Sequence, residues 1–281
     1  MNVNIIYFSA TGVTEEIAKA IGKEFEDRSA SVSYINLLFK ENRKKCSSFE
    51  KDDKFIFGFP VYASTIPDIT KEWLKTLKGL NNQTGMFFTY GARAVGKSHK
   101  VTFQILKKRT FKVVLSAEFI GRHSYNIAEG FLAVPDRPND EDIKVAKKFA
   151  KELYQRFKDP ETKELDFSEP LKPENIVNPD IPFAFNPKSF NTKRVTETCQ
   201  MCYRCEIECP TYSFKADKGI SNPETCIHCM HCAVICPDNV IFPGDMSDFY
   251  FWFINFNNLT DESMNNKPSL IRYQIPQFKS N

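Results

Sequence analysis

NIIYFSATGVT, residues 4–14, is the stretch from which the fold of the first half of the chain follows. Its first five residues form a mostly apolar run that suits a buried strand. The remaining six are small, and three of them carry hydroxyl groups. They lead into a stretch from Thr14 to Phe25 whose apolar side chains recur at the spacing of one helical face. A buried strand followed by a turn and a helix is the repeating unit of a parallel sheet.

Strand-like and helix-like stretches continue to alternate as far as residue 158. Further strands are expected at Ser31–Leu37, Phe55–Phe59, Met86–Tyr90 and Val113–Ile120. Further helices are expected at Asp68–Leu80, Ser98–Arg109 and Asn139–Phe157. The sequence therefore predicts an α/β fold with a doubly wound parallel sheet of five strands and helices on both faces.

The turn after the first strand has the chemistry of a phosphate site. In doubly wound sheets, ligands bind at the carboxyl ends of the strands. The hydroxyls of Ser9, Thr11 and Thr14 converge there with backbone N–H groups and a helix N-terminus, and Gly12 permits a close turn. A P-loop is excluded because the G-x4-G-K-[ST] pattern does not occur at this turn. The alternative is an ordinary helix cap. The candidate phosphate residues are Ser9, Ala10, Thr11, Gly12, Val13 and Thr14.

Two further loops are expected at the same sheet edge, after the third and fourth strands. Each contains an aromatic ring, Tyr62 in one and Tyr90 in the other, that could stack on a flat heterocycle. Ordinary edge packing is the alternative for each ring. Together with the phosphate turn, the loops predict a mononucleotide site. Its further candidate residues are Pro60, Val61, Tyr62, Ala63, Thr89, Tyr90 and Gly91.

Eight of the nine cysteines form one pattern, C-x2-C-x2-C-x3-C-P, written twice with an offset of 27 residues. The first copy holds Cys199, Cys202, Cys205 and Cys209, and the second holds Cys226, Cys229, Cys232 and Cys236. This pattern is typical of bacterial ferredoxins, in which the fourth cysteine of each copy ligates the other cluster. It predicts one [4Fe–4S] cluster on Cys199, Cys202, Cys205 and Cys236, and a second on Cys226, Cys229, Cys232 and Cys209.

Other uses of these cysteines fit the pattern less well. Zinc sites use pairs of C-x2-C motifs, not two quartets that each end in Cys-Pro. The N-terminus lacks the basic and apolar regions of a signal peptide, so a cytoplasmic location is expected. Disulfides are not expected in that reducing compartment. His228 and His231 lie inside the second copy and are interpreted as spacers. Cys46 is interpreted as a free thiol.

With these motifs in view, residues 1–158 resemble a flavodoxin, whose [T/S]-x-T-G-x-T phosphate loop matches Ser9–Thr14. The whole chain resembles a flavodoxin–ferredoxin fusion, a family of cytoplasmic redox proteins of anaerobes. The resemblance implies FMN, with its phosphate on that loop and its isoalloxazine ring between Pro60–Ala63 and Thr89–Gly91. It also implies a small α+β bacterial ferredoxin-like domain at residues 192–242. One departure is charge, since many flavodoxins are acidic and this domain is basic.

The remaining segments complete the organisation. Residues 159–191 are rich in proline and are expected to form an extended connector. Residues 243–281 form a tail with aromatic residues at Phe249–Phe256, which could shield a cofactor, bind a partner or pack on the first domain. No segment is long and apolar enough to span a membrane.

Charge divides unevenly along the chain. Residues 1–158 contain 27 Lys and Arg against 18 Asp and Glu, a net charge of +9, and residues 159–281 contain 11 against 17, a net charge of −6. The lysines of the basic half are scattered along the expected helix faces, so nucleic-acid binding is not predicted. Attraction between the two halves would favour their docking.

Two functions fit these features. In the first, the chain carries electrons between donor and acceptor proteins through FMN and the clusters. In the second, the flavin reduces a small molecule such as a quinone or a nitro compound. The sequence favours the carrier, because it holds no second dinucleotide fingerprint and no nucleophile–base pair. A non-redox sensor would leave the flavin site unexplained. Loop residues that could approach the flavin, each more often a surface residue than a catalytic one, are Arg93, His99, Arg122, His123 and Tyr125.

Overall fold

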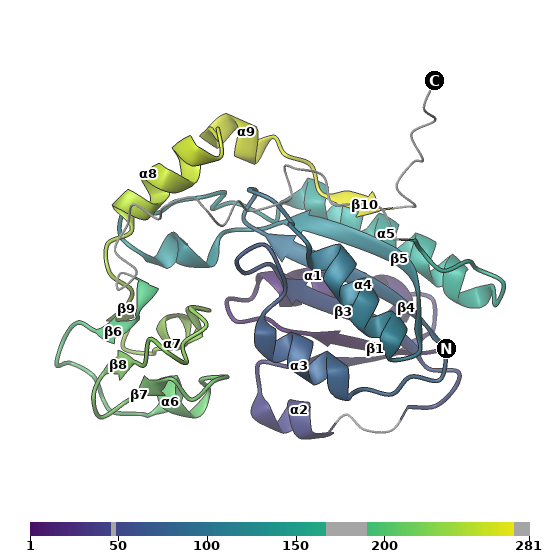
Figure 1. The fold of residues 1–281 in the computed structure, drawn as a ribbon, viewed down its shortest axis with the longest axis horizontal. Coiled ribbons are helices and arrows are strands. Elements are labelled where there is room, and N and C mark those ends of the chain that lie inside the picture. Colours follow the sequence, from purple (N-terminus) through teal and green to yellow (C-terminus); the bar gives the residue numbers. More distant parts are fainter. Residues whose placement is uncertain (46–48, 167–189, 273–281) are drawn as a thin grey trace.

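A computed structural model describes residues 1–45, 49–166 and 190–272 of the chain (Figure 1). The free thiol expected at Cys46 lies outside the described residues. So do most of the expected proline-rich connector and the last nine residues of the tail. Within the described parts, a large sheet domain lies beside a small cysteine-rich unit, and the tail passes over both (Figure 1).

The sheet domain is built on six strands. They are β1 (Asn2–Tyr7), β2 (Ser31–Asn36), β3 (Lys54–Pro60), β4 (Asn82–Tyr90), β5 (Phe111–Ile120) and β10 (Leu270–Arg272). The order across the sheet is β10-β5-β4-β3-β1-β2. The pairs among β1 to β5 are all parallel, so the predicted α/β fold with a parallel sheet is confirmed. The strand order reverses beside β1 and β3, which puts a ligand-binding crevice at their carboxyl ends.

The prediction of five strands is wrong by one, because the tail adds β10 to the edge of the sheet. β10 pairs antiparallel with β5, with Leu270 opposite Glu118 and Arg272 opposite Ser116. The strand is only three residues long and joins the sheet from far along the chain. Neither period-2 alternation nor a neighbouring turn marks so short a strand in the sequence.

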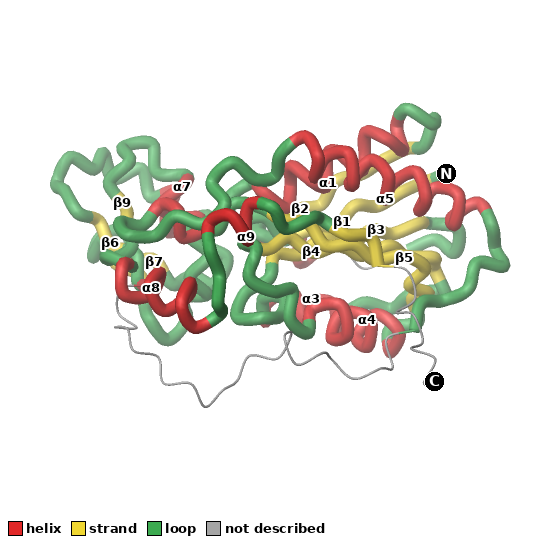
Figure 2. The backbone as a smooth tube through the Cα atoms, turned by 90° about the horizontal axis from the view of Figure 1, so that it is seen from above, coloured by secondary structure: helices red, strands yellow, loops and turns green. Residues whose placement is uncertain are grey.

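Helices cover both faces of the sheet, as Figure 2 shows. One face carries α1 (Val13–Glu26) and α5 (Asp140–Lys158), and the other carries α3 (Asp68–Thr76) and α4 (Ser98–Lys108). α5 begins at a capping box in which Asn139 and Asp142 each accept a hydrogen bond from the other's backbone N–H. The short helix α2 (Lys40–Lys45) was not predicted, because its sequence KENRKK has no apolar stripe.

The core lies in two layers, one on each side of the sheet. On the α1 and α5 side, Ile17, Ile21 and Phe25 are fully buried against Phe149 and Leu153. The other layer contains the aromatic residues of β3, with the rings of Phe55 and Phe57 lying 5.4 and 5.6 Å from that of Phe111. Each fully buried phenylalanine contributes about 2–3 kcal/mol of stability, so this dense packing fixes the strand ends that carry the site.

The small unit contains a four-stranded antiparallel sheet with the order β7-β8-β6-β9. Its elements are β6 (Lys193–Arg194), α6 (Arg204–Ile207), β7 (Phe214–Lys215), β8 (Ile220–Ser221), α7 (His231–Val234) and β9 (Ile241–Phe242). The last three repeat the first three at the 27-residue offset of the cysteine motifs. The unit is therefore an internal duplication in structure as well as in sequence.

The tail joins the two parts. α8 (Ser247–Phe256) starts next to the small unit, and α9 (Asp261–Asn265) leads from it to β10 at the sheet edge (Figure 1). The ring of Phe249 stacks on Phe131 of the sheet domain at 5.6 Å and contacts Phe190 at 4.9 Å. None of the helices in the described parts of the chain could cross a membrane.

Candidate cofactor sites

The turn between β1 and α1 forms a small polar hollow at the carboxyl edge of the sheet. Gly12 has φ +91°, a left-handed conformation that glycine adopts without steric cost. The Ser9 hydroxyl accepts a hydrogen bond from the backbone N–H of Glu15 at 3.1 Å, so it also helps to cap α1. The hydroxyls of Thr14 and Thr89 lie 2.7 Å apart, which joins the first loop to the third. The hollow is lined by most of the predicted residues, namely Ser9, Ala10, Thr11, Val13, Thr14, Pro60, Val61, Tyr62, Thr89, Tyr90 and Gly91.

Two residues support this turn that the motif did not reveal. Asn36, at the end of β2, accepts a hydrogen bond from Ser9 N at 3.2 Å and donates to Ser9 O at 3.3 Å, which fixes the turn. Arg122 lines the same hollow, and its Nη2 would lie 3.8 Å from a Cβ built on Gly12. Its Nη1 is 3.3 Å from Glu16. Arg122 was among the loop residues expected to approach the flavin, and the structure brings it to the phosphate turn.

A larger cavity of about 450 Å³ adjoins the turn. Its walls come from the loops after β3, β4 and β5, from the second cysteine motif, from α8 of the tail, and from Phe190 at the end of the connector. Its size is within the range of small-molecule sites, which is about 300–1,000 Å³. The lining residues are Val61, Tyr62, Ala63, Ser64, Tyr90, Gly91, Arg93, Ala94, His123, Tyr125, Phe190, Ile227, His228, Phe249, Trp252 and Phe253.

The loop after β3 enters the cavity in a strained conformation. Tyr62 and Thr65 exchange two backbone hydrogen bonds of 2.7 and 3.1 Å, which close a two-residue turn. Both central residues are left-handed, Ala63 with φ 47° and Ser64 with φ 64°, although neither is glycine. Such residues cost about 1–3 kcal/mol each and collect at ligand sites. Gly96 packs so closely on Ser64 that a Cβ there would lie 2.2 Å from Ser64 O, so the loop after β4 holds this turn in place.

The cavity has an aromatic lining, and His123, one of its two histidines, is neutral at physiological pH. The ring of His123 lies 4.7 Å from Phe131 and 5.8 Å from Phe253. Burial, with the charge of Arg93 as a second cause, lowers the pKa of His123 to about 4. Burial also raises the pKa of Tyr62 and Tyr125, and the charge of nearby Cys229 adds to both shifts. The two tyrosines therefore lie close to the second cysteine motif as well as in the cavity.

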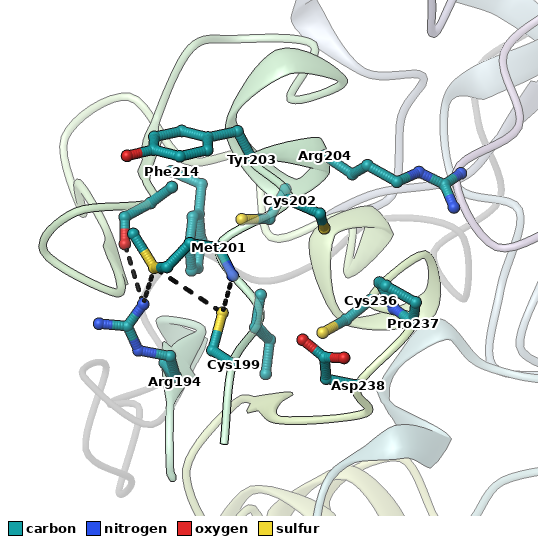
Figure 3. Close-up of a pocket in the computed structure, with 13 residues that line it drawn as sticks. Arg194, Cys199, Met201, Cys202, Tyr203, Arg204, Phe214, Cys236, Pro237 and Asp238 are labelled. Atoms are coloured by element: carbon teal, nitrogen blue, oxygen red, sulfur yellow. Dashed lines mark hydrogen bonds between the residues drawn. The ribbon is translucent and has the colours of Figure 1, made fainter. Parts of the chain in front are cut away.

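The eight cysteines gather into two groups, each around its own hollow. One hollow is lined by Cys199, Cys202, Cys205 and Cys236, and the other by Cys209, Cys226, Cys229 and Cys232. Figure 3 shows Cys236, from the second motif, beside Cys199 and Cys202 of the first. The fourth cysteine of each motif thus faces the other motif's hollow. Within the described chain, no three His, Cys, Asp or Glu side chains form a site for a single metal ion.

Both motifs wind around their hollows with the same backbone conformation. Met201 and His228 occupy equivalent positions with φ 53° and 51°, and Tyr203 and Met230 do so with φ 61° and 62°. These left-handed residues turn N–H groups toward the sulfurs. Met201 N lies 3.4 Å from Cys199 Sγ, and His228 N lies 3.4 Å from Cys226 Sγ. Four thiols around each hollow, with N–H donors to sulfur, are the donor set that a thiolate-ligated iron–sulfur cluster requires.

The small unit contacts the phosphate turn through one buried histidine. His231 is 6% exposed and lies between Cys229 and Cys232. Its Nδ1 is 2.9 Å from the carbonyl oxygen of Ala10, and its Nε2 is 3.2 Å from Glu208 Oε2. The sequence interpretation of His231 as a spacer missed this role, because the partner lies 221 residues away. Arg43 of α2 adds a second contact, with Nη2 donating to Pro210 O at 2.9 Å.

Of the loop residues that were expected to approach the flavin, Arg93, His123 and Tyr125 line the large cavity and His99 does not. His99 lies on α4, where Nδ1 is 2.7 Å from Ser116 Oγ and Nε2 is 2.9 Å from Glu118 Oε2. Burial alone would raise the pKa of Glu118, but hydrogen bonds and charge from His99 and from Arg272 of β10 outweigh it and lower the pKa to about 2. This network anchors the tail strand to the sheet.

Comparison with known proteins supports the assignment of the N-terminal domain. Residues 4–126 match the family model described as a flavodoxin domain. The N-terminal part of the chain therefore contains a flavodoxin domain. No curated protein matches the chain.

Among the solved structures that resemble this chain are flavodoxins of low sequence identity. A flavodoxin from the domain Archaea is 17% identical, with a TM-score of 0.42 over 57% of this chain and 100% of that chain. Oxidised flavodoxin 2 from Bacillus cereus is 15% identical, with a TM-score of 0.41 over 56% of this chain and 99% of that chain. A Fusobacterium nucleatum flavodoxin mutant bound to flavin mononucleotide is 18% identical, with a TM-score of 0.39 over 56% of this chain and 96% of that chain.

Proposed function

We propose that this protein is an electron carrier that binds FMN in its flavodoxin domain and two [4Fe–4S] clusters in its small unit. The FMN phosphate would bind the turn Ser9–Thr14 and its ring would occupy the adjoining cavity. One cluster would bind Cys199, Cys202, Cys205 and Cys236, and the other Cys209, Cys226, Cys229 and Cys232. FMN exchanges electrons singly or in pairs and each cluster exchanges one, so the bound cofactors would connect two-electron and one-electron partners.

One observation carries the proposal. The cavity next to the phosphate turn has the second cysteine motif as part of its wall, through Ile227 and His228. Ile227 directly follows Cys226 in the sequence, and His228 directly precedes Cys229. A flavin ring in this cavity would therefore be a neighbour of the second cluster within the same chain.

The chain's own residues would hold the two sites in register. His231 bonds to Ala10 of the phosphate turn, and Glu208, which bonds to His231, precedes Cys209. His231, which belongs to the second cysteine motif, thus contacts both the phosphate turn and the first cysteine motif. Aromatic residues of α8 line the cavity. Cys202, in the other group, is exposed, which gives a protein partner access to the first cluster.

A second candidate function is the reduction of a small molecule at the flavin. It is favoured by the apolar lining and the size of the cavity, because a protein partner could not enter a space roofed by Phe249, Trp252 and Phe253. A flat aromatic compound could. In that case the clusters would deliver electrons to the flavin, and the substrate would accept them there.

The test is anaerobic purification followed by measurement of the cofactors and by redox titration. The proposal predicts FMN in equal amount to the chain, with iron and sulfide in the amounts of two clusters. Absorbance and EPR should then show a flavin and two separate cluster signals. Rapid, saturable reoxidation of the flavin by quinones or nitro compounds would favour the second candidate function. A protein with clusters and no flavin would exclude both functions.

A further inference from the structure

Arg93 carries the only formal charge among the described residues that line the large cavity at neutral pH. The lining contains no aspartate and no glutamate, and no carboxylate of the described chain forms an ion pair with Arg93. The side chain is half-buried among aromatic residues. A buried cation without an anionic partner is costly, and burial accordingly lowers the pKa of the Arg93 guanidinium. The cavity therefore presents an unpaired positive charge that could bind an anionic ligand.

The guanidinium is fixed in place by neutral partners. Its Nε donates to Asn257 Oδ1 at 2.9 Å, and Asn257 Nδ2 donates in turn to Phe253 O at 2.8 Å. The two Nη atoms lie only 3.4 and 3.5 Å from Ser64 Oγ, which are long hydrogen bonds. A guanidinium has five N–H donors. Most of the donors of Arg93 therefore remain available to a molecule in the cavity.

The surroundings make this charge effective. His123, which faces the same cavity, is neutral because its pKa is lowered to about 4. Lys267 of the tail donates to the carbonyl oxygens of Ala92 and Arg93 at 2.9 and 2.7 Å, which adds positive charge behind the loop. An aromatic lining has a low local dielectric constant, in which a single charge acts more strongly than in water.

We propose that Arg93 is the anion-binding residue of the cavity and that the anion is the ring of FMN in its reduced state. The inference rests on the proposed function. Addition of two electrons and one proton to the oxidised ring at neutral pH gives a reduced ring with one negative charge. The electrons come from the clusters or from a redox partner, and the proton comes from solvent. Arg93 would thus favour the reduced flavin over the oxidised flavin.

Dissociation constants of oxidised and of reduced FMN test this directly, because their ratio does not depend on turnover. The variants are Arg93→Gln, which can still bond to Asn257, and Arg93→Lys, which keeps the charge. The control is Arg109→Gln, which removes an equal charge from an exposed position at the far end of α4. All four proteins are measured with their clusters loaded, under anaerobic conditions.

We expect Arg93→Gln to weaken the binding of reduced FMN about tenfold more than that of oxidised FMN. This corresponds to a midpoint potential about 30 mV lower for the two-electron couple. Arg93→Lys should show a smaller change, and Arg109→Gln none. Equal weakening of both forms by Arg93→Gln would show a merely structural role and would overturn the inference while the proposed function stands. A wild-type protein that binds no FMN would overturn the proposed function itself, and this inference with it.

Discussion

Replacement of Asp142 by alanine should destabilise the protein strongly, because Asp142 is the buried centre of the attachment between the tail and the sheet domain. Its side chain is 1% exposed. One carboxylate oxygen accepts from Arg137 Nη2 and from Ser269 Oγ, each at 2.5 Å. The other accepts from Arg137 Nε at 2.5 Å and from Asn139 N at 2.8 Å. Arg137 in turn donates to the carbonyl oxygens of Asn265 and Lys267 in the tail.

The magnitude follows from what the truncation leaves behind. Arg137 has a side chain only 6% exposed, and without Asp142 its charge would be buried and unpaired. Loss of one partner of a buried ion pair costs about 3–5 kcal/mol, and loss of half of the capping box costs about 1 kcal/mol more. If the free energy of unfolding falls by about 3 kcal/mol per M of urea, the urea concentration at the unfolding midpoint should fall by about 1–2 M.

The assay is urea unfolding of the cofactor-loaded protein, monitored by circular dichroism. Two further variants are measured in the same way. Asp142→Asn keeps the size and part of the cap, and it should lose most of the same stability because Arg137 stays unpaired. Glu141→Ala is the matched control, since Glu141 is the neighbouring residue and its side chain, 75% exposed, pairs with Lys144 at the surface. It should change stability by less than about 1 kcal/mol. A loss below about 1 kcal/mol in Asp142→Ala would show that Asp142 does not hold the tail on the sheet domain.

Four other predictions concern the cofactor sites and pH. Cys209→Ser should remove the EPR signal of the cluster on the second motif, and selective loss of the other cluster would exclude the crossed assignment. Gly12→Val should weaken FMN binding about tenfold or more at unchanged iron content, since a β-branched residue at φ +91° is strained; flavin retained at full affinity would speak against the phosphate turn. His231→Leu should weaken FMN binding several-fold by loss of the bond to Ala10, whereas His231→Gln should lose less, as titration with FMN would show. The folded-state pKa of His123 is below its ordinary value of 6.5. The free energy of unfolding should therefore be unaffected above pH 6.5 and decline as the pH falls toward 4, by about 1 kcal/mol at pH 5.5. Urea midpoints measured across this pH range should show the decline in the wild type and not in His123→Phe, which has no imidazole to titrate.

Much of the sheet domain could be predicted from the sequence because its signals are local. The run Asn4–Phe8, the turn after it and the stripe of Ile17, Ile21 and Phe25 lie within one short stretch, and each matches a simple period. The same holds for the two cysteine motifs, whose fixed spacing alone suggests two groups of four. In these segments, propensity, pattern and burial agree.

The remaining features depend on contacts between distant residues. β10 is three residues long and pairs with β5, so nothing near it in the sequence marks a strand. Arg122, which follows β5, reaches the phosphate turn because the carboxyl ends of the parallel strands β1 and β5 lie at the same edge of the sheet. The aromatic run Phe249–Phe256 was recognised, but its role as a roof over the cavity follows from packing on Phe131 and Phe190. Such long-range packing is what single-sequence patterns do not encode.

In the proposed function, a flavin and the second cluster are neighbours within one chain. Laser-flash photoreduction of the flavin in the anaerobic, oxidised protein tests it most directly, with the flavin and cluster absorbances followed in time. We predict that the electron leaves the flavin for a cluster at a rate independent of protein concentration, and that this step is lost in Cys209→Ser. A transfer rate proportional to protein concentration, or a flavin that keeps its electron while both clusters stay oxidised, would show that the flavin and the second cluster are not neighbours within the chain.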